Sequence, residues 1–172
     1  MFKLIPLEAI QPYILTLRMD AESQAFFDKQ RELYFPRERN FLKAHISLFH
    51  QLPNDTFTKQ QLKDVKQAPV ALKITGMQNL GAGVAYKIES DALQDLHRQL
   101  SACFKDELIP QDRQRYRPHI TIQNKVTLEQ AKALIEKLNA DFEPFEITGI
   151  GLDLWTYRGG PWEFDVFYPF KG

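Results

Sequence analysis

His45-Ile-Ser-Leu48 and His119-Ile-Thr-Ile122 repeat one pattern at an offset of 74 residues. A second pair follows at nearly the same spacing, because Lys73-Ile-Thr-Gly-Met77 matches Glu146-Ile-Thr-Gly-Ile150 at an offset of 73. Each match alone carries little weight. Two matches at almost one offset, with a helix-capping pattern between them in both halves, indicate an internally duplicated chain.

The residues around these matches predict the same order of elements twice: strand, helix, His-bearing strand, capped helix, strand. We expect strands at 13–19, 44–52, 70–80, 84–89, 118–126, 146–157 and 162–170, with polar loops at 34–43 and 105–117. This pattern predicts an α+β fold. We expect a single domain, residues 1–172, made of two pseudo-symmetric lobes.

Four helices are expected between these strands. Asp20 is the expected N-cap of a helix that runs to about Leu33. Thr58-Lys-Gln-Gln61 and Thr127-Leu-Glu-Gln130 both fit the capping box, in which a Thr and a Gln three apart satisfy exposed N–H groups. In the helix from Asp91 to Phe104, helical spacing predicts a buried stripe of Leu93, Leu96, Leu100 and Cys103 and leaves His97 on the surface.

The composition limits the class of function. The 172 residues include 22 Lys and Arg against 22 Asp and Glu, and zero net charge argues against a protein that coats long nucleic acid by electrostatics alone. A small phosphate ligand in a local cationic cleft remains compatible. One cysteine excludes an internal disulfide, and no apolar run approaches the roughly 20 residues of a membrane span. Since Met1–Gln11 also lacks a signal-peptide core, we expect a cytoplasmic protein. We also expect a monomer.

The two His-bearing strands each offer an imidazole and a hydroxyl on one face. Side chains alternate along a strand, so His45 and Ser47 point to one side, as do His119 and Thr121. Duplication would bring the two pairs across one groove. In-line attack at phosphorus needs a base and an acid on opposite sides of the phosphate, and two histidines supply both near neutral pH. The hydroxyls can donate hydrogen bonds to the non-bridging oxygens, and this chemistry needs no metal or cofactor.

The two motifs resemble the H-x-[ST]-hydrophobic motifs of the 2H phosphoesterase superfamily, which includes the 2'-5' RNA ligase-like RNA 2',3'-cyclic phosphodiesterases. The resemblance extends from Tyr13 to Phe170. It implies a bilobal fold in which antiparallel sheets line a central cleft with helices packed outside. It also implies metal-independent hydrolysis of 2',3'-cyclic phosphate or 2'-5' phosphodiester bonds at RNA or nucleotide ends. His45, Ser47, His119 and Thr121 are then the catalytic residues.

Three points stay open at this stage. Either histidine can be the acid or the base, and we take His119 as the base without a physical argument. The substrate can instead be the cyclic phosphate of a small nucleotide such as ADP-ribose. The chain can also be a non-catalytic module that binds RNA or a nucleotide.

Further residues are candidates for substrate binding. Lys43 and Arg117 lie two residues before the histidines, where a cation would stabilise a phosphate. Phe49 and Gln123 continue the faces of the two motifs, and Phe49 can stack on a base or pack at the floor of the cleft. His50 falls on the opposite face from His45. Candidates for stacking on a base are Tyr34, Phe35, Tyr116, Trp155, Tyr157 and Trp162. The loops before the motifs add Arg37, Arg39, Arg113 and Arg115, and Arg158-Gly-Gly-Pro-Trp162 is expected to form a turn.

Overall fold

The computed structural model describes residues 11–172. The expectation that Met1–Gln11 lacks a signal peptide therefore concerns residues almost wholly outside this range. The strands are β1 (Tyr13–Met19), β2 (Ile46–Leu52), β3 (Val70–Asn79), β4 (Val84–Glu89), β5 (His119–Gln123), β6 (Phe145–Thr156) and β7 (Glu163–Pro169). The helices are α1 (Ala21–Tyr34), α2 (Thr56–Lys63), α3 (Asp91–Cys103) and α4 (Leu128–Asn139), with short 3-10 turns η2 (Arg37–Arg39) and η3 (Pro110–Arg113).

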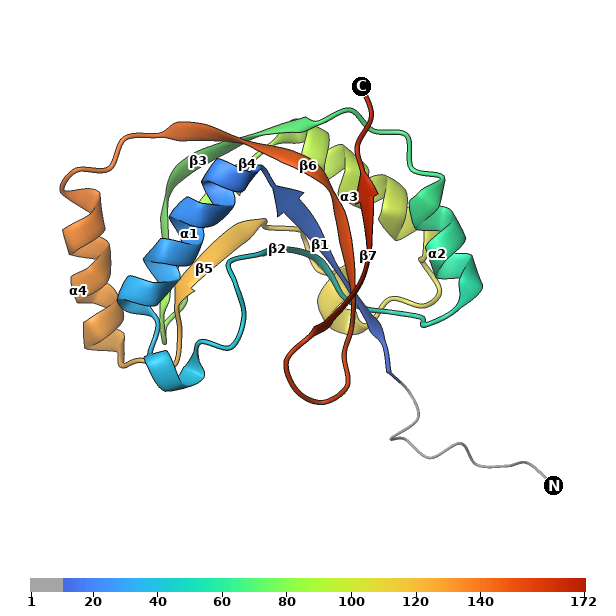
Figure 1. Ribbon diagram of the computed structural model, residues 1–172. Helices are drawn as coiled ribbons and strands as arrows, with labels where there is room; N and C mark the ends of the chain where they lie inside the picture. Colours follow the sequence, from blue (N-terminus) through green and yellow to red (C-terminus); the bar gives the residue numbers. More distant parts are fainter. Residues whose placement is uncertain (1–10) are drawn as a thin grey trace.

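All described strands belong to one antiparallel sheet in the order β2-β1-β6-β3-β4-β5, and β7 pairs with β6 beside this path. The long strand β6 joins its two parts. The first residues of β6 pair with β3, and its later residues pair with β1 and β7. The sheet curls until its end strands, β2 and β5, approach each other, so it is nearly closed (Figure 1).

The order of elements repeats as the sequence predicts, and the α+β fold is confirmed. β1, α1, β2, α2 and β3 are followed by β4, α3, β5, α4 and β6. In Figure 1, α1 and α4 lie on one flank of the curled sheet, and α2 and α3 lie on the other. Helix α1 packs on β5, and α4 packs on β3 and β4. The two His-bearing strands are therefore held at the two ends of one sheet.

The helix starts test the predicted caps. Asp20 caps α1 by accepting the backbone N–H of Ser23 at 2.9 Å, and Thr127 and Gln130 form the predicted capping box of α4. The capping box predicted at Thr58 is wrong. Asp55 accepts the N–H of Thr58 at 2.8 Å and starts α2 at Thr56, because a carboxylate three residues earlier already satisfies that donor. The Thr58 side chain is consequently buried inside the first turn.

One apolar cluster fills the interior between the sheet and the helices. Leu93, Leu96 and Leu100 are buried on α3 as predicted. Cys103 is exposed, and the next residue, Phe104, takes the expected inner place. His97 is only 8% exposed, against the prediction of a surface position, because it lies one turn after Leu93 on the same stripe. Within residues 11–172, no helix is long and apolar enough to cross a bilayer.

Candidate active site

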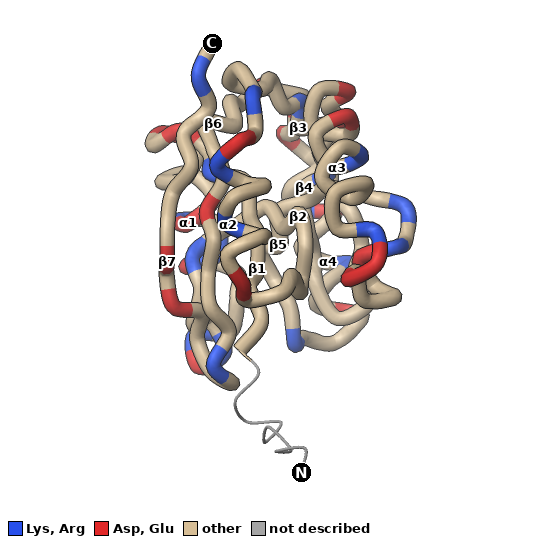
Figure 2. Tube along the Cα trace, turned by 90° about the vertical axis from the view of Figure 1, so that its right-hand side faces the viewer, with Lys and Arg blue, Asp and Glu red and all other residues tan. Residues whose placement is uncertain are grey.

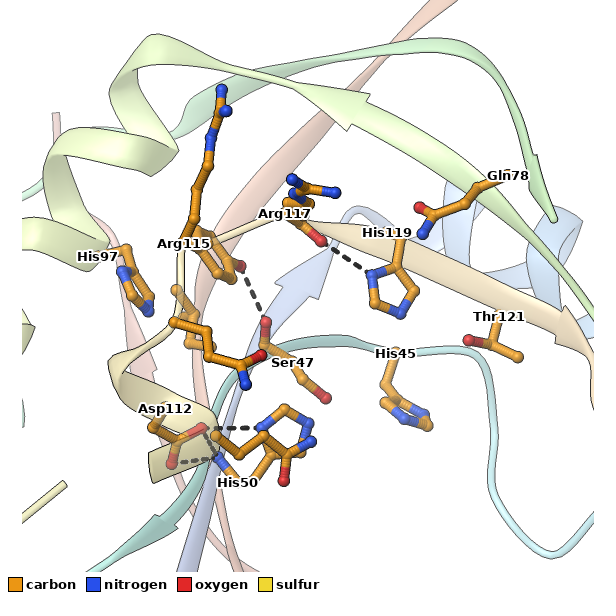
Figure 3. Close-up of a pocket in the computed structure, with 14 residues that line it drawn as sticks. His45, Ser47, His50, Gln78, His97, Asp112, Arg115, Arg117, His119 and Thr121 are labelled. Atoms are coloured by element: carbon orange, nitrogen blue, oxygen red, sulfur yellow. Dashed lines mark hydrogen bonds and ion pairs between the residues drawn. The ribbon is translucent and has the colours of Figure 1, made fainter. Parts of the chain in front are cut away.

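The four motif residues meet in one hollow of about 350 Å³, called here the central hollow. His45 and Ser47 reach it from the start of β2, and His119 and Thr121 reach it from β5 (Figure 3). The other lining residues are Leu48, His50, Gln78, His97, Gln111, Asp112, Gln114, Arg115, Tyr116 and Arg117. Each motif thus presents its imidazole and hydroxyl to the same space from opposite ends of the sheet.

The two imidazoles are tethered in the same way. Nδ1 of His45 lies 2.8 Å from the carbonyl oxygen of Lys43, and Nδ1 of His119 lies 2.9 Å from that of Arg117. A carbonyl oxygen only accepts hydrogen bonds, so each Nδ1 carries the proton and donates. This contact leaves Nε2 of each neutral ring with a free lone pair. The sequence places these carbonyls two residues before each histidine.

The environment of His45 disfavours its charged form. Burial is the main cause that lowers the pKa of His45 to about 4, and the hydrogen bond with the carbonyl of Lys43 opposes it. The positive charges of Arg31, His119 and His50 lower the pKa further. The ring of Trp162 covers one side of the imidazole, with ring centroids 4.7 Å apart. His45 is therefore a neutral imidazole at pH 7 in the ligand-free protein.

Arg31 is a buried cation beside the motifs that the sequence analysis missed. Its side chain comes from α1, whose polar sequence gives no sign of burial, yet the residue is only 4% exposed. Nη1 donates to the carbonyl oxygen of Thr121 at 2.9 Å, and Nε donates to Oδ1 of Asn40 at 3.1 Å. Burial lowers the pKa of Arg31, opposed by the charge of Asp28. This guanidinium ties α1 to the strand that carries the second motif.

A stack of three aromatic rings packs against the first motif. His97 lies between Phe49 and Tyr116, with centroid distances of 4.7 Å and 3.9 Å and nearly parallel planes. The hydroxyl of Tyr116 donates to the carbonyl oxygen of Ser47 at 2.9 Å. Tyr116 and His97 therefore fix the backbone at the hydroxyl-bearing residue of β2.

Two predicted binding residues, Phe49 and Gln123, point away from the hollow for one shared reason. In β2, Ser47 pairs with Thr16 but Phe49 pairs with Leu15, so Leu48 is an extra residue in the strand. Such a bulge reverses the expected alternation of side chains. Phe49 is fully buried, which corrects the expectation that it faces a substrate.

Strand β5 carries the matching bulge. Thr121 pairs with Ala85 and Gln123 pairs with Val84, which makes Ile122 the extra residue. Gln123 is 7% exposed and does not line the hollow, so its predicted contact with a substrate is also wrong. The same irregularity therefore follows both motifs.

The remaining candidates divide between the hollow and the surface. Arg117, Arg115 and Tyr116 line the central hollow. Lys43 is exposed and lines neither this hollow nor the adjoining one, since only its carbonyl turns toward His45. Tyr157 is 41% exposed and lies outside both, so the structure does not bring Lys43 or Tyr157 to the site. The candidates Tyr34, Trp155, Arg37 and Arg113 also lie outside both.

A second hollow of about 450 Å³ adjoins the first and shares His45 and Thr121 with it. Phe41 is 70% exposed at its rim, and Gly160 and Pro161 come from the predicted turn between β6 and β7. Its other lining residues are Arg31, Phe35, Arg39, Leu42 and Asn124. The motif residues thus stand where a polar hollow meets a more aromatic one.

The bulge in β2 also moves His50, which the regular alternation places on the far side. His50 lines the central hollow, and its Nδ1 lies 2.8 Å from Oδ1 of Asp112. The partner comes from η3, 62 residues later in the chain, so no local pattern reveals the pair. All four histidines of the sequence therefore line one hollow.

Charge is otherwise spread over the protein. Figure 2 shows basic and acidic residues interspersed along the trace. Among residues 11–172, no group of three or more His, Cys, Asp or Glu side chains is arranged to hold a metal ion. The positive lining of the central hollow is therefore a local feature of a chain with zero net charge.

Twin imidazole and hydroxyl pairs at the ends of a nearly closed antiparallel sheet define the class of this protein as 2H phosphoesterase-like. A sequence profile of the 2'-5' RNA ligase superfamily matches residues 19–161, and the chain belongs to this family. A sequence search among curated proteins finds no significant match.

Solved structures share the fold over almost their whole length. Escherichia coli LigT complexed with 3'-AMP has a TM-score of 0.61 at 13% identity, covering 95% of this chain and 99% of LigT. The protein TT0787 of Thermus thermophilus has a TM-score of 0.65 at 15% identity, covering 94% and 98%. A structure described as a phosphoesterase has a TM-score of 0.64 at 14% identity, covering 95% and 99%. At these identities the likeness concerns the fold.

Proposed function

We propose that the protein is a metal-independent phosphoesterase that hydrolyses 2',3'-cyclic phosphate or 2'-5' phosphodiester bonds at RNA or nucleotide ends. The observation that carries this proposal is the matched tethering of His45 and His119, which leaves both Nε2 atoms available in one hollow. The structural relative LigT binds 3'-AMP, which has the form of a product of such a reaction. We also propose a single domain of two lobes that acts in the cytoplasm as a monomer.

The proposed reaction is a single in-line displacement at phosphorus. Nε2 of His119 takes a proton from water while the water oxygen forms a bond to phosphorus. The bond from phosphorus to the ribose 2' or 3' oxygen breaks, and Nε2–H of His45 protonates that oxygen. From a cyclic phosphate the product is a phosphate monoester next to a free hydroxyl, whereas from a 2'-5' linkage it is a 5'-phosphate and a separate nucleoside end with a free 2'-hydroxyl. In both cases one proton leaves the water and one reaches the leaving oxygen.

The neighbouring side chains stabilise the charge that develops in this step. The hydroxyls of Ser47 and Thr121 donate to the non-bridging oxygens, and Arg117 offsets their negative charge. His45 is neutral before a ligand binds, so the acid role requires that it takes up a proton when the phosphate anion binds beside it.

The decisive experiment is hydrolysis of the four 2',3'-cyclic mononucleotides and of a short RNA with a terminal cyclic phosphate, at neutral pH with EDTA. We expect turnover by the wild type and a loss of about 10²–10⁴-fold or more in His45→Ala and His119→Ala. Arg37→Gln, a charge change outside both hollows, serves as the control.

Each outcome separates the alternatives. Turnover that EDTA abolishes contradicts metal independence. A loss of less than tenfold in both histidine variants contradicts the two-histidine mechanism. Faster turnover of mononucleotides than of RNA favours a small nucleotide as the substrate. Nucleotide binding without turnover, retained when both histidines are replaced, favours the binding module.

A further inference from the structure

The central hollow contains one exposed imidazole that the proposed reaction does not use. His97 is stacked between two rings and supports the first motif, so it has a structural role. His50 differs, because 45% of its side chain is exposed and it faces the hollow. It lies away from Thr121, at the end of the hollow formed by η3 (Figure 3).

A buried carboxylate holds His50 in place. The side chain of Asp112 is only 1% exposed, and its oxygens accept the backbone N–H groups of His50 and Gln51 at 2.9 to 3.0 Å. Burial opposes ionisation of Asp112, but these hydrogen bonds and the one from the His50 ring outweigh it and lower its pKa. Asp112 is therefore ionised at neutral pH and accepts the Nδ1–H of His50. Nε2 of His50 is turned away from Asp112, toward Ser47 and His45 (Figure 3).

The charges that line the hollow exceed what one phosphate requires. Arg115 and Arg117 both line it, and among the described residues Asp112 is its one acidic lining residue. That carboxylate is already engaged by two backbone amides and by His50. Arg117 stands beside His119, and the side chain of Arg115 extends away from His50 (Figure 3). His50 is thus a further hydrogen-bonding side chain of the hollow beyond the two motifs.

We propose that His50, held by Asp112, is a second anion subsite that binds another phosphate group of the substrate. The inference rests on the proposed function, because it assumes that the first phosphate lies between His45 and His119. In the proposed complex His50 donates Nδ1–H to Asp112 and Nε2–H to the phosphate, and such a charge-assisted hydrogen bond is stronger than a neutral one. The substrate class is a nucleotide end with two phosphates, either a 5'-phosphorylated nucleotide or the last residue of an RNA.

Calorimetry with two non-reacting ligands tests the subsite directly. Adenosine 3'-monophosphate carries one phosphate, and adenosine 3',5'-bisphosphate adds the second. We expect the wild type to bind the bisphosphate about tenfold more tightly, which corresponds to roughly 1.4 kcal/mol. His50→Gln should reduce this preference to about threefold or less. Arg37→Gln should keep it.

The same ligands define the results that would overturn the subsite. Equal affinity of the wild type for both ligands would show that the protein does not recognise the second phosphate. A full preference in His50→Gln shows that other residues bind it. Circular dichroism of the variant confirms that it is folded, and the substitution changes an exposed side chain.

Kinetics identifies the source of the second phosphate. A cyclic mononucleotide with a 5'-phosphate and a dinucleotide with a terminal cyclic phosphate are each compared with the unphosphorylated cyclic mononucleotide. If the 5'-phosphorylated cyclic mononucleotide has a higher kcat/KM and the gain depends on His50, the second phosphate is the nucleotide's own 5'-phosphate. If the dinucleotide shows this gain, the second phosphate is the next phosphodiester of RNA. Absence of turnover with a bisphosphate preference that depends on His50 overturns the proposed reaction and still supports the subsite.

Discussion

The buried guanidinium of Arg31 donates to the carbonyl oxygen of Thr121 at 2.9 Å, and its positive charge lowers the pKa of His45. Arg31→Met removes that charge while keeping a long apolar stem. The protonated form of His45 is then less disfavoured, so its pKa should rise above about 4 toward the ordinary value. An NMR titration of the imidazole resonances measures this shift.

The charge-preserving variant Arg31→Lys is the control for that titration. It should leave the pKa of His45 close to the wild-type value, because Lys keeps the positive charge even though it loses the planar hydrogen bonds. An unchanged titration in Arg31→Met would show that the charge of Arg31 does not contribute to the shift.

The roles of the two histidines separate when the leaving group needs no proton. A nucleoside 2'-phosphate p-nitrophenyl diester releases p-nitrophenolate, which leaves without an acid. With His45 as the acid, His45→Ala should stay within about tenfold of the wild type on this substrate and still lose about 10²–10⁴-fold on a cyclic phosphate. His119→Ala should be slow on both. The reverse pattern would exchange the two roles.

Two substitutions at the start of α2 should change the free energy of unfolding in different directions. Asp55→Ala removes the oxygen that accepts the Thr58 N–H and should cost about 1 kcal/mol of unfolding free energy. Thr58 Oγ1 is buried without a hydrogen-bond partner among the described residues. Thr58→Val replaces that hydroxyl with a methyl group of similar size and should be neutral or stabilising by about 1 kcal/mol. Urea denaturation measures the free energy of unfolding of both variants. If Thr58→Val is destabilised, the hydroxyl of Thr58 does contribute to the cap of α2.

The bulge after the second motif depends on a glycine that faces it. A Cβ on Gly83 would overlap the carbonyl oxygen of Gln123, whereas a Cβ on Gly160 would meet nothing within 4 Å. Gly83→Ala should therefore cost about 1–3 kcal/mol and slow turnover by displacing β5, which carries His119. Gly160→Ala is the matched control and should keep wild-type stability. Equal stability of the two variants would show that β5 shifts freely.

The two bulges limit what the sequence alone predicts about the orientation of side chains in the site. Alternation along a strand correctly groups His45 with Ser47 and His119 with Thr121, because each pair lies before the bulge. It fails at Phe49, Gln123 and His50, which lie after it. A bulge arises from pairing with another strand, so the local pattern carries no sign of it.

The missed site residues depend on contacts between distant parts of the chain. Asp112 reaches His50 across 62 residues, and Arg31 reaches Thr121 across 90. Arg31 stands on a helix with a mostly polar sequence, so the usual preference of arginine for the surface predicts the wrong place for it. The repeated order of elements was predictable because it rests on local patterns of apolar residues and caps.

The lowered pKa of His45 also makes stability depend on pH. The unfolded chain binds a proton at His45 near pH 6.5 and the folded protein only near pH 4, so unfolding takes up protons between these values. The unfolding free energy should therefore fall as pH drops from 6.5 to 4. Below about pH 4, loss of the hydrogen-bonded Asp20 and Asp112 carboxylates, whose pKa values are lowered, should destabilise it further.

His45→Gln removes the first of these two contributions. In urea denaturation at pH 7, 5.5 and 4.5, the variant should lose less stability than the wild type as pH falls. Burial also lowers the pKa of His97, so a smaller slope remains in the same direction. Below pH 4 the two proteins should respond alike, since both keep Asp20 and Asp112. Parallel curves from pH 7 to 4.5 would show that His45 is protonated as easily in the folded protein as in the unfolded chain.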